Sequence, residues 1–211
     1  MYYQINLTNN VILQGPVSLS SEIDRLQPSL LANLGAAFPG RTDWENIGWY
    51  PEVTATPSYN PLNQVLGPPT SPVVDTVNFL VNDTYSVVSM TGPQIALAGQ
   101  NNYNSLIASG IVISSTSTPA LNGVYDITTN ARVNVHGERY YIDKYGTFSN
   151  GELVRYWQEL SGSISGAQFS IAQFEAMAQS IAQYYDNLNT YLATVSTGNY
   201  TPAPTNAYTI P

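Results

Sequence analysis

Charged side chains are scarce in this chain of 211 residues, where they make up 9% of the total. An ordinary soluble domain has about 25%. The chain contains six Lys and Arg and fourteen Asp and Glu, which gives a formal net charge of −8. The six cations are scattered along the chain: Arg25, Arg41, Arg132, Arg139, Lys144 and Arg155. Because binding to phosphates or anionic lipids needs clustered cations, we expect neither nucleic-acid binding nor docking on anionic membranes.

Cysteine is absent and histidine occurs once, as His136. These absences exclude a disulfide scaffold, a thiolate metal site and a cysteine nucleophile, and they leave no ordinary zinc site. A catalytic triad would need His136 with Asp126 or Asp143 as its orienting acid, but no serine lies in a Gly-x-Ser-x-Gly turn. Acidic pairs such as Glu152 and Glu159 are too easily found among fourteen acids to indicate a glycosidase. The sequence therefore predicts a protein that is not an enzyme and has no cofactor or metal.

Long apolar runs are also missing, since none approaches the roughly 18 residues of a membrane helix. The first residues, Met1 to Asn6, show neither a basic segment nor an apolar segment of a secretory signal. We therefore expect no membrane insertion and synthesis in a cytoplasm.

Residues 1–90 predict a small β-rich domain. A strand over Tyr2–Leu7 is followed by an Asn9-Asn10 turn and a hairpin partner. Apolar residues in 20–34 have helical spacing, but Pro28 divides them, which predicts two short turns. A proline-rich loop is predicted over 51–72, made of short edge strands and extended connections without a central strand. The last predicted strands are Val73–Val77 and Thr84–Met90, with the turn at Asn82-Asp83.

Residues 91–196 predict an α+β domain. Thr91 and Pro93 are typical of a helix start, and Gly110 of a helix end. A further helix is possible over 129–145, although Gly137 weakens it. The clearest element is an amphipathic helix over 171–192 that begins with a capping box, Ser170-x-x-Gln173. Residues 197–211 contain three prolines and predict an extended tail, so the predicted fold class of the whole chain is α+β.

Two stretches of the chain contain recognisable motifs. The first contains Gly48-Trp49-Tyr50-Pro51 and then Pro57-Ser58-Tyr59-Asn60, followed later by Tyr85-Ser86-Val87. It resembles the N-terminal module of small bacteriophage tail proteins, which has a Gly-Trp-x-Pro segment, a P-x-Y-[DN]-x-x-x-Q stretch and a strand ending in Y-x-V.

The second stretch resembles a domain of phage tail-fibre assembly and tail-fibre-associated proteins. Ala120 to Tyr125 match its A-L-N-G-x-Y motif, and Asn122-Gly123 predicts a positive-φ turn there. Gly146 to Gly151 and Trp157 to Gly162 correspond to its next two segments, with Ser149 in place of a proline and Glu159 in place of an aspartate. The helix start at Phe169 and the ending Ala207 to Pro211 also suit this family.

The resemblance implies a phage tail protein, made in the host cytoplasm and located in the virion, that binds a tail-fibre or baseplate protein without covalent chemistry. Two roles remain open, a permanent structural subunit and a fibre-assembly chaperone. The aromatic residues expected to contact the partner are Trp49, Tyr50, Tyr59, Tyr184, Tyr191, Tyr200 and Tyr208. The low charge fits a surface covered by another protein, because burying amides and hydroxyls costs less than burying ions.

The alternative is a carbohydrate-binding module that recognises a host surface glycan. Trp44, Trp49, Tyr50 and Tyr59 would then stack on sugar rings. The competing interpretation places these side chains in the core of a strand-poor domain.

Overall fold

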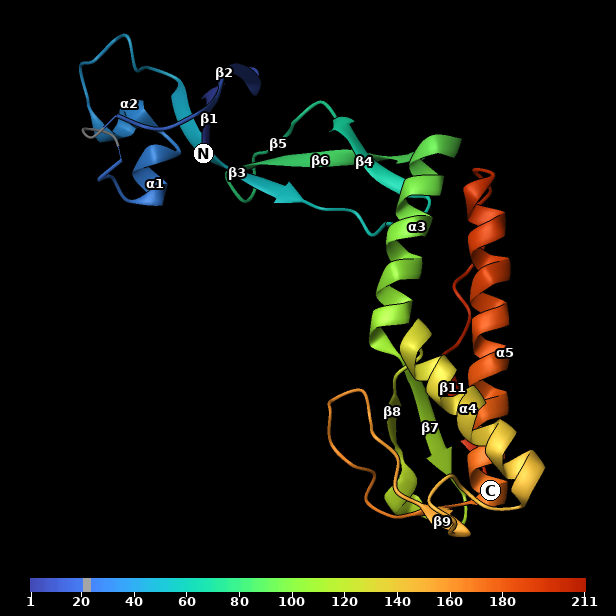
Figure 1. Ribbon diagram of the computed structural model, residues 1–211. Helices are drawn as coiled ribbons and strands as arrows, with labels where there is room; N and C mark the ends of the chain where they lie inside the picture. The colour runs from blue at the N-terminus through green and yellow to red at the C-terminus, as the bar shows by residue number, and fades with distance from the viewer. Residues whose placement is uncertain (21–23) are drawn as a thin grey trace. The chain divides into compact units, whose positions relative to one another are not determined.

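A computed structural model describes residues 1–20 and 24–211 and shows an α+β fold (Figure 1). The chain divides into two compact units, Met1–Ser89 and Met90–Pro211. The division lies next to the boundary predicted at residues 90 and 91.

Unit 1 is built around a curled sheet with the strand order β2-β1-β3-β6-β4, and β5 pairs with β6 (Figure 1). Its strands are β1 (Tyr2–Asn6), β2 (Val11–Val17), β3 (Ile47–Ala55), β4 (Gln64–Pro69), β5 (Val73–Asp75) and β6 (Leu80–Ser89). The predicted hairpin of β1 and β2 is present and antiparallel. Two four-residue helices, α1 (Pro28–Leu31) and α2 (Leu34–Ala37), replace the two turns expected in 20–34, while Ile23 lies outside the described residues.

Strand β3 corrects the prediction of a proline-rich loop over 51–72. It lies between β1 and β6 in the sheet, and its first half pairs with β1 while Glu52–Ala55 pair in parallel with β6. Pro51 is opposite Tyr2, at the last position of the β1 pairing, immediately before the partner changes. Pro51 therefore lies where the pairing with β1 ends and the pairing with β6 begins. Because it interrupts neither set of hydrogen bonds, a proline is tolerated in this central strand.

The predicted turn at Asn82-Asp83 is wrong. Strand β6 begins at Leu80 and runs through both residues, and the chain reverses before it at residues 76–79. The Asp75 carboxylate holds this turn by accepting the backbone N–H groups of Val77 and Asn78, both at 3.0 Å. Asp83 is buried and accepts a hydrogen bond from the Tyr3 hydroxyl at 3.1 Å, so a residue typical of turns serves here as a strand residue.

The core of unit 1 consists of two small clusters. One joins Tyr3, Ile5, Ala32, Tyr50 and Val81, and the other joins Leu31, Leu34 and Trp49. None of these buried residues comes from β4 or from β6 after Val81. One half of the sheet therefore has a core, and the half formed by β4 and the end of β6 has none.

Unit 2 holds the long helices α3 (Gly92–Ser109), α4 (Thr129–Tyr145) and α5 (Ile171–Ser196). Its strands and short helix are β7 (Ile111–Ser115), η1 (Pro119–Leu121), β8 (Gly123–Tyr125), β9 (Val154–Arg155), β10 (Phe169–Ser170) and β11 (Ala207–Ile210). Strands β11, β7 and β8 form a three-stranded sheet in that order, and β9 pairs with β10. Figure 1 shows α5 running beside α3 and α4.

The helix boundaries follow from local chemistry. Capping boxes start α3 at Thr91 and α5 at Ser170, as predicted. The helix proposed over 129–145 is present in full as α4, and Gly146 ends it with a φ of +72°, where a glycine is favoured. The prediction of a positive-φ turn at Asn122-Gly123 is wrong, because η1 makes the connection and Asn122 has a φ of −64°.

One continuous core fills unit 2. Helix α5 supplies much of it, including Phe174, Met177, Tyr184 and Leu188, each with 0% exposure. The end of the chain is tied to this core, since β11 pairs in parallel with β7 and Ile210 is buried. The extended tail predicted over 197–211 therefore finishes as a strand of unit 2.

Candidate protein-binding surface

Four of the seven predicted contact residues are buried within their own units, which corrects the prediction. Trp49 and Tyr50 are 7% and 2% exposed in unit 1, and Tyr184 and Tyr191 are 0% and 3% exposed in unit 2. Tyr191 accepts a hydrogen bond from the Asn102 amide at 3.0 Å, which joins α5 to α3. These rings stabilise the fold and are not available to a partner.

The other three predicted residues do not form one surface. Tyr59 belongs to unit 1 and Tyr200 to unit 2, and each is 38% exposed. Tyr208 is half-buried, and its ring centroid lies 6.1 Å from that of Tyr184. The structure therefore leaves Tyr59 and Tyr200 partly exposed in different units, while Tyr208 packs against the core of unit 2.

The exposed face of α4 carries an aromatic group that the sequence analysis did not single out. Its members are Val133, Tyr140, Tyr141 and Tyr145, which are 64%, 60%, 37% and 54% exposed. Helical spacing places Val133 and Tyr140 opposite the buried Val135 and Ile142, and Tyr141 and Tyr145 on an adjoining side. The rings of Tyr141 and Tyr145 are 4.5 Å apart, and Lys144 approaches Tyr140 and Tyr145. Tyrosines of this kind are typical of protein interfaces, because one side chain offers both apolar area and a hydroxyl.

Basic side chains line one edge of the same helix. Arg132, His136 and Arg139 are spaced four and three residues apart, so they follow one side of α4. They line a pocket of about 100 Å³ whose other wall comes from α5. The Nε of Arg139 is buried without a hydrogen-bond partner. Together with Lys144, this edge places four of the seven basic side chains of the chain on α4, so the cations are less scattered than expected.

A second hollow of about 260 Å³ continues from Arg132 toward α3 and contains Tyr103 and Tyr185. The Arg132 guanidinium stacks over the Tyr185 ring at 3.3 Å. A hydrogen bond with Tyr103 lowers the pKa of the Tyr185 hydroxyl, and the positive charge of Arg132 adds to that effect. Burial raises the pKa of Tyr103. The two hollows share Arg132, so the basic edge adjoins the pair of tyrosine hydroxyls.

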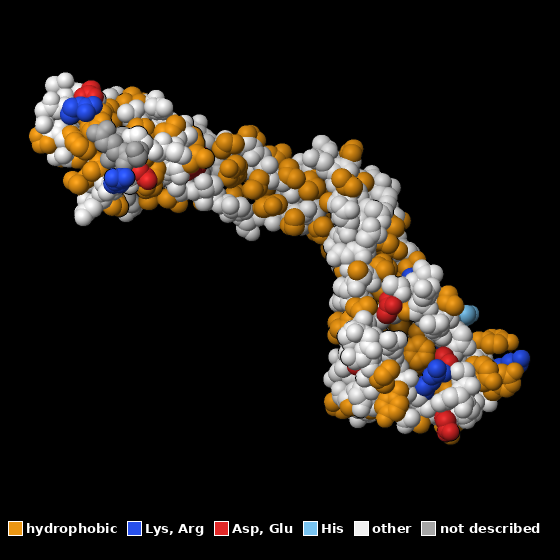
Figure 2. Space-filling model, turned by 60° about the vertical axis from the view of Figure 1, so that its left-hand side comes forward, with side chains coloured by type: hydrophobic (Ala, Val, Ile, Leu, Met, Phe, Trp, Pro, Cys, Tyr) orange, Lys and Arg blue, Asp and Glu red, His pale blue; other side chains and the backbone are white. Residues whose placement is uncertain are grey.

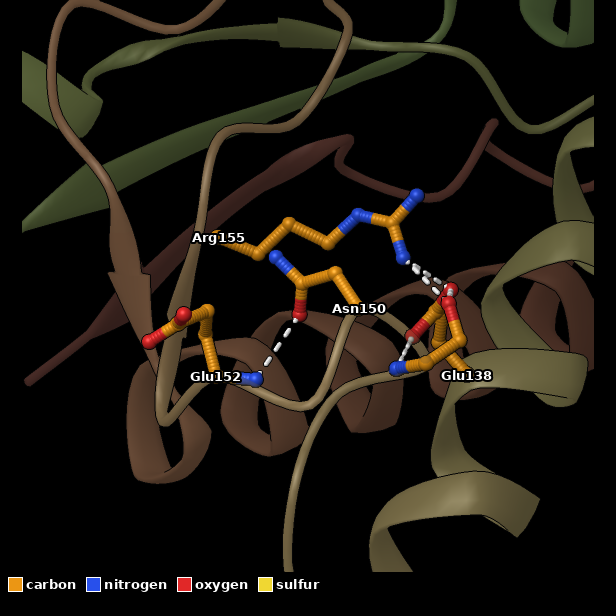
Figure 3. Close-up of polar contacts among 5 residues, drawn as sticks. Glu138, Asn150, Glu152 and Arg155 are labelled. Atoms are coloured by element: carbon orange, nitrogen blue, oxygen red, sulfur yellow. Dashed lines mark hydrogen bonds and ion pairs between the residues drawn. The ribbon is translucent and has the colours of Figure 1, made fainter.

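The region next to the other side of α4 has a structural ion pair (Figure 3). The buried Glu138 carboxylate contacts the Arg155 guanidinium, accepts the Ser149 N–H at 3.0 Å and accepts the Ser149 hydroxyl at 2.5 Å. In the same loop, the Asn150 side-chain oxygen accepts the Glu152 N–H at 3.1 Å. A proline at 149, as in the resembled family, could not donate its backbone nitrogen to Glu138. These contacts attach residues 149–155 to α4 and provide the Glu138 carboxylate with hydrogen-bond and ion-pair partners.

Over residues 1–20 and 24–211, no group of three or more His, Asp or Glu side chains has metal-binding geometry. His136 lies on the edge of α4 beside two arginines rather than beside an acid and a serine. Within the same described ranges, no helix has the length and hydropathy needed to cross a bilayer.

The aromatic residues of the glycan alternative are mostly packed inside unit 1. The rings of Trp44 and Phe38 pack edge-on with their centroids 4.6 Å apart. The Arg41 guanidinium lies 4.1 Å from the centroid of the Trp44 ring. Trp49 is buried, but it lines an apolar pocket of about 270 Å³ together with Pro28 and Phe79. An open stacking platform is therefore absent from these described side chains, and the pocket beside Trp49 is the feature nearest to a sugar site.

Comparisons with known proteins found no matching family, no similar curated protein and no similar solved structure.

Proposed function

We propose that this protein is a non-catalytic phage tail component that binds a tail-fibre or baseplate protein through the exposed face of α4. The observation that carries the proposal is the combination on one helix of an exposed tyrosine group and a basic edge, Arg132, His136 and Arg139, that forms no ion pair with any described residue. The phage assignment rests on the order of the sequence motifs described above. It places the protein in the virion after synthesis in the host cytoplasm.

Charge indicates the chemistry of the partner surface. The chain as a whole is acidic, with a formal net charge of −8, while α4 carries Arg132, His136, Arg139 and Lys144. Of its two acids, Glu138 pairs with Arg155, and the exposed Asp143 is not among the residues that line the pocket beside Arg132, His136 and Arg139. A partner segment with carboxylates would pair with this edge and meet repulsion over most of the remaining surface. Its apolar side chains would pack on Tyr140 and Tyr145, which are the type of residue that contributes most to binding.

Co-expression with candidate tail-fibre and baseplate proteins, followed by affinity purification and calorimetry of the complex, tests the proposal. We expect Tyr140→Ser and Arg139→Glu each to weaken the complex by at least about tenfold, which corresponds to about 1.4 kcal/mol. Tyr156→Ser is the matched control, because Tyr156 is a similarly exposed tyrosine, at 52%, outside α4. Absence of any complex, or equal loss with Tyr156→Ser, would contradict the proposal.

Purified virions distinguish the two roles left open by the sequence. A structural subunit would be found there in a fixed ratio to the fibre or baseplate protein. A fibre-assembly chaperone would bind its partner in the host and be missing from the particles.

The pocket beside Trp49 supports glycan binding as the second candidate function. It is apolar, and the ring of Trp49 forms part of its wall. Saturable binding of a host surface glycan that Phe79→Ala abolishes would support this function, because Phe79 also lines the pocket but is 49% exposed. Unchanged binding of the glycan by Phe79→Ala would exclude the pocket as its site.

A further inference from the structure

The pocket between α4 and α5 is lined by basic and apolar side chains. The basic ones are Arg132, His136 and Arg139 of α4. The apolar ones are Val135 of α4 and Ala178, Ile181 and Ala182 of α5. The pocket has a volume of about 100 Å³, so it admits a short chemical group. Sites for drug-sized ligands have about 300–1,000 Å³. The lining therefore fits a small group that is negatively charged at one end and apolar at the other.

Arg139 has a hydrogen-bond donor that the described residues leave unsatisfied. Its Nε is buried and has no hydrogen-bond partner. A guanidinium group only donates hydrogen bonds, so the partner of this atom has to be an acceptor. A buried charged donor without an acceptor costs free energy, because its lost hydration is not replaced. Arg139 therefore favours a ligand that brings an acceptor atom into the pocket.

The acids of the two helices do not neutralise this basic edge. Glu138 is paired on another side of α4. Asp143 follows Arg139 by four residues, yet it forms no ion pair with any described residue, and the same is true of Glu175 and Asp186 of α5. None of these four acids lines the pocket. The cations therefore attract an anion from outside the described part of the chain.

His136 and Arg139 are the two cations placed to hold one small anion. His136 is exposed, and Figure 2 shows the single histidine of the chain, in pale blue, at the surface of unit 2. Arg132 is already engaged, because its guanidinium stacks over the Tyr185 ring and donates to the Thr129 hydroxyl at 3.3 Å. Seven residues also separate Arg132 from Arg139, which is about 10.5 Å along a helix. His136 is only three residues from Arg139, so a single carboxylate can contact both.

We propose that this pocket binds the carboxylate of a glutamate side chain that the partner presents to α4. The inference rests on the proposed function, because it names the group of the partner that enters the basic edge. The carboxylate accepts the Nε–H of Arg139 beside His136, and charge strengthens this hydrogen bond. The two methylene groups of the glutamate pack on the apolar residues of α5. Phosphate has no apolar part and would leave that lining unused.

Titration of the intact chain with sodium propionate tests the proposal, because propionate reproduces the end of a glutamate side chain. His136 is the only histidine, so its ring C–H protons give a unique proton NMR signal within the site. At constant pH, and at constant ionic strength maintained with chloride, we expect propionate to shift this signal in a saturable manner. Acetate, which corresponds to aspartate, should bind about two- to fourfold more weakly, since it has one CH₂ group fewer to bury.

Substitutions separate this site from a general attraction of anions. Arg139→Gln should weaken propionate binding by at least about tenfold, since it removes both the charge and the buried donor. Arg139→Lys keeps the charge but not the guanidinium donor, so it should not restore the affinity. Arg25→Gln is the matched control, because it removes the same charge from an exposed arginine of unit 1. It should change the affinity by less than about twofold, since an exposed charge is screened by salt.

An unchanged His136 signal in propionate, or equal weakening by Arg139→Gln and Arg25→Gln, would overturn the proposal. Acetate or inorganic phosphate that binds as tightly as propionate would also overturn it, because the apolar lining would then contribute nothing. The titration needs no partner, so its failure is distinct from that of the proposed function. A missing complex contradicts the proposed function, whereas an unchanged His136 signal contradicts only the role assigned to this pocket.

Discussion

The two units differ in how many of their apolar side chains are buried. Among the described residues, unit 2 buries eighteen apolar side chains and unit 1 buries eight. Each unit nevertheless exposes twelve large apolar side chains, although unit 1 is the shorter one. Unit 2 has one core, whereas unit 1 has two small clusters, neither of which includes a residue of β4 or of β6 after Val81. The difference indicates that unit 2 has much more internal packing than the half of unit 1 formed by β4 and the end of β6.

The largest expected effect concerns the core of unit 2. Phe174 is fully buried and packs edge-on against Phe148 and Trp157, so Phe174→Ala should lower the free energy of unfolding by about 3–5 kcal/mol. Urea unfolding followed by the helical circular dichroism signal measures this loss. Gln183→Ala, at an exposed position of α5, should change stability by less than about 0.5 kcal/mol. A loss below about 1 kcal/mol for Phe174→Ala would show that unit 2 does not depend on this core.

Alkaline pH should affect both units. Burial raises the pKa of Tyr3 in unit 1 to about 12, helped by its hydrogen bond to Asp83, and burial raises the pKa of Tyr125 in unit 2 to about 12. Each unfolded tyrosine ionises near 10.0, so the folded chain holds these protons more tightly. Their stabilisation is therefore complete below about pH 10 and is lost as pH rises toward about 12.

Unfolding free energies measured across this pH range test that expectation. Tyr3→Phe and Tyr125→Phe should each flatten the decline, because each removes one titrating hydroxyl. A decline that neither variant alters would assign the alkaline sensitivity to other groups.

The smallest expected effects come from a pair of helix glycines. A Cβ on Gly99 would lie 2.4 Å from a Val195 methyl group, so Gly99→Ala should force α3 away from α5 and destabilise unit 2 by about 1–3 kcal/mol. A Cβ on Gly137 in α4 meets nothing within 4 Å, so Gly137→Ala should stabilise the helix by about 0.5–1 kcal/mol. Thermal unfolding of both variants measures the contrast. Shifts of the same sign would contradict the close helix packing at Gly99.

Local signals made much of the fold predictable. The capping boxes at Thr91 and Ser170 and the apolar stripe of α5 locate two helices without any tertiary information. The turn before β6 is predicted in the wrong place because Asn82-Asp83 has high turn propensity. In the structure Asp83 is a strand residue that accepts a hydrogen bond from the Tyr3 hydroxyl, eighty residues away. Contacts at that sequence separation leave no local pattern.

The binding surface was harder to predict than the fold. Aromatic composition shows that rings are present but does not show whether they face the core or the solvent. Tyr184 and Tyr191 are therefore predicted as contact residues, although the structure buries both in the core. The sequence signal for α4 is the spacing of Arg132, His136 and Arg139, which places them on one side of a helix. Tyr140 and Tyr145 lie on other sides of the same helix. Only the packing of α4 against α5 shows which of these sides is exposed.

Hydrogen exchange on the intact chain tests most directly the claim that unit 2 has a continuous core while the half of unit 1 formed by β4 and residues 85–89 has none. We expect the backbone amides of α5 to exchange slowly, because they open only when the core of unit 2 opens. We expect the amides of residues 85–89 to exchange much faster than those of α5. Exchange of residues 85–89 as slow as that of α5 would contradict the claim.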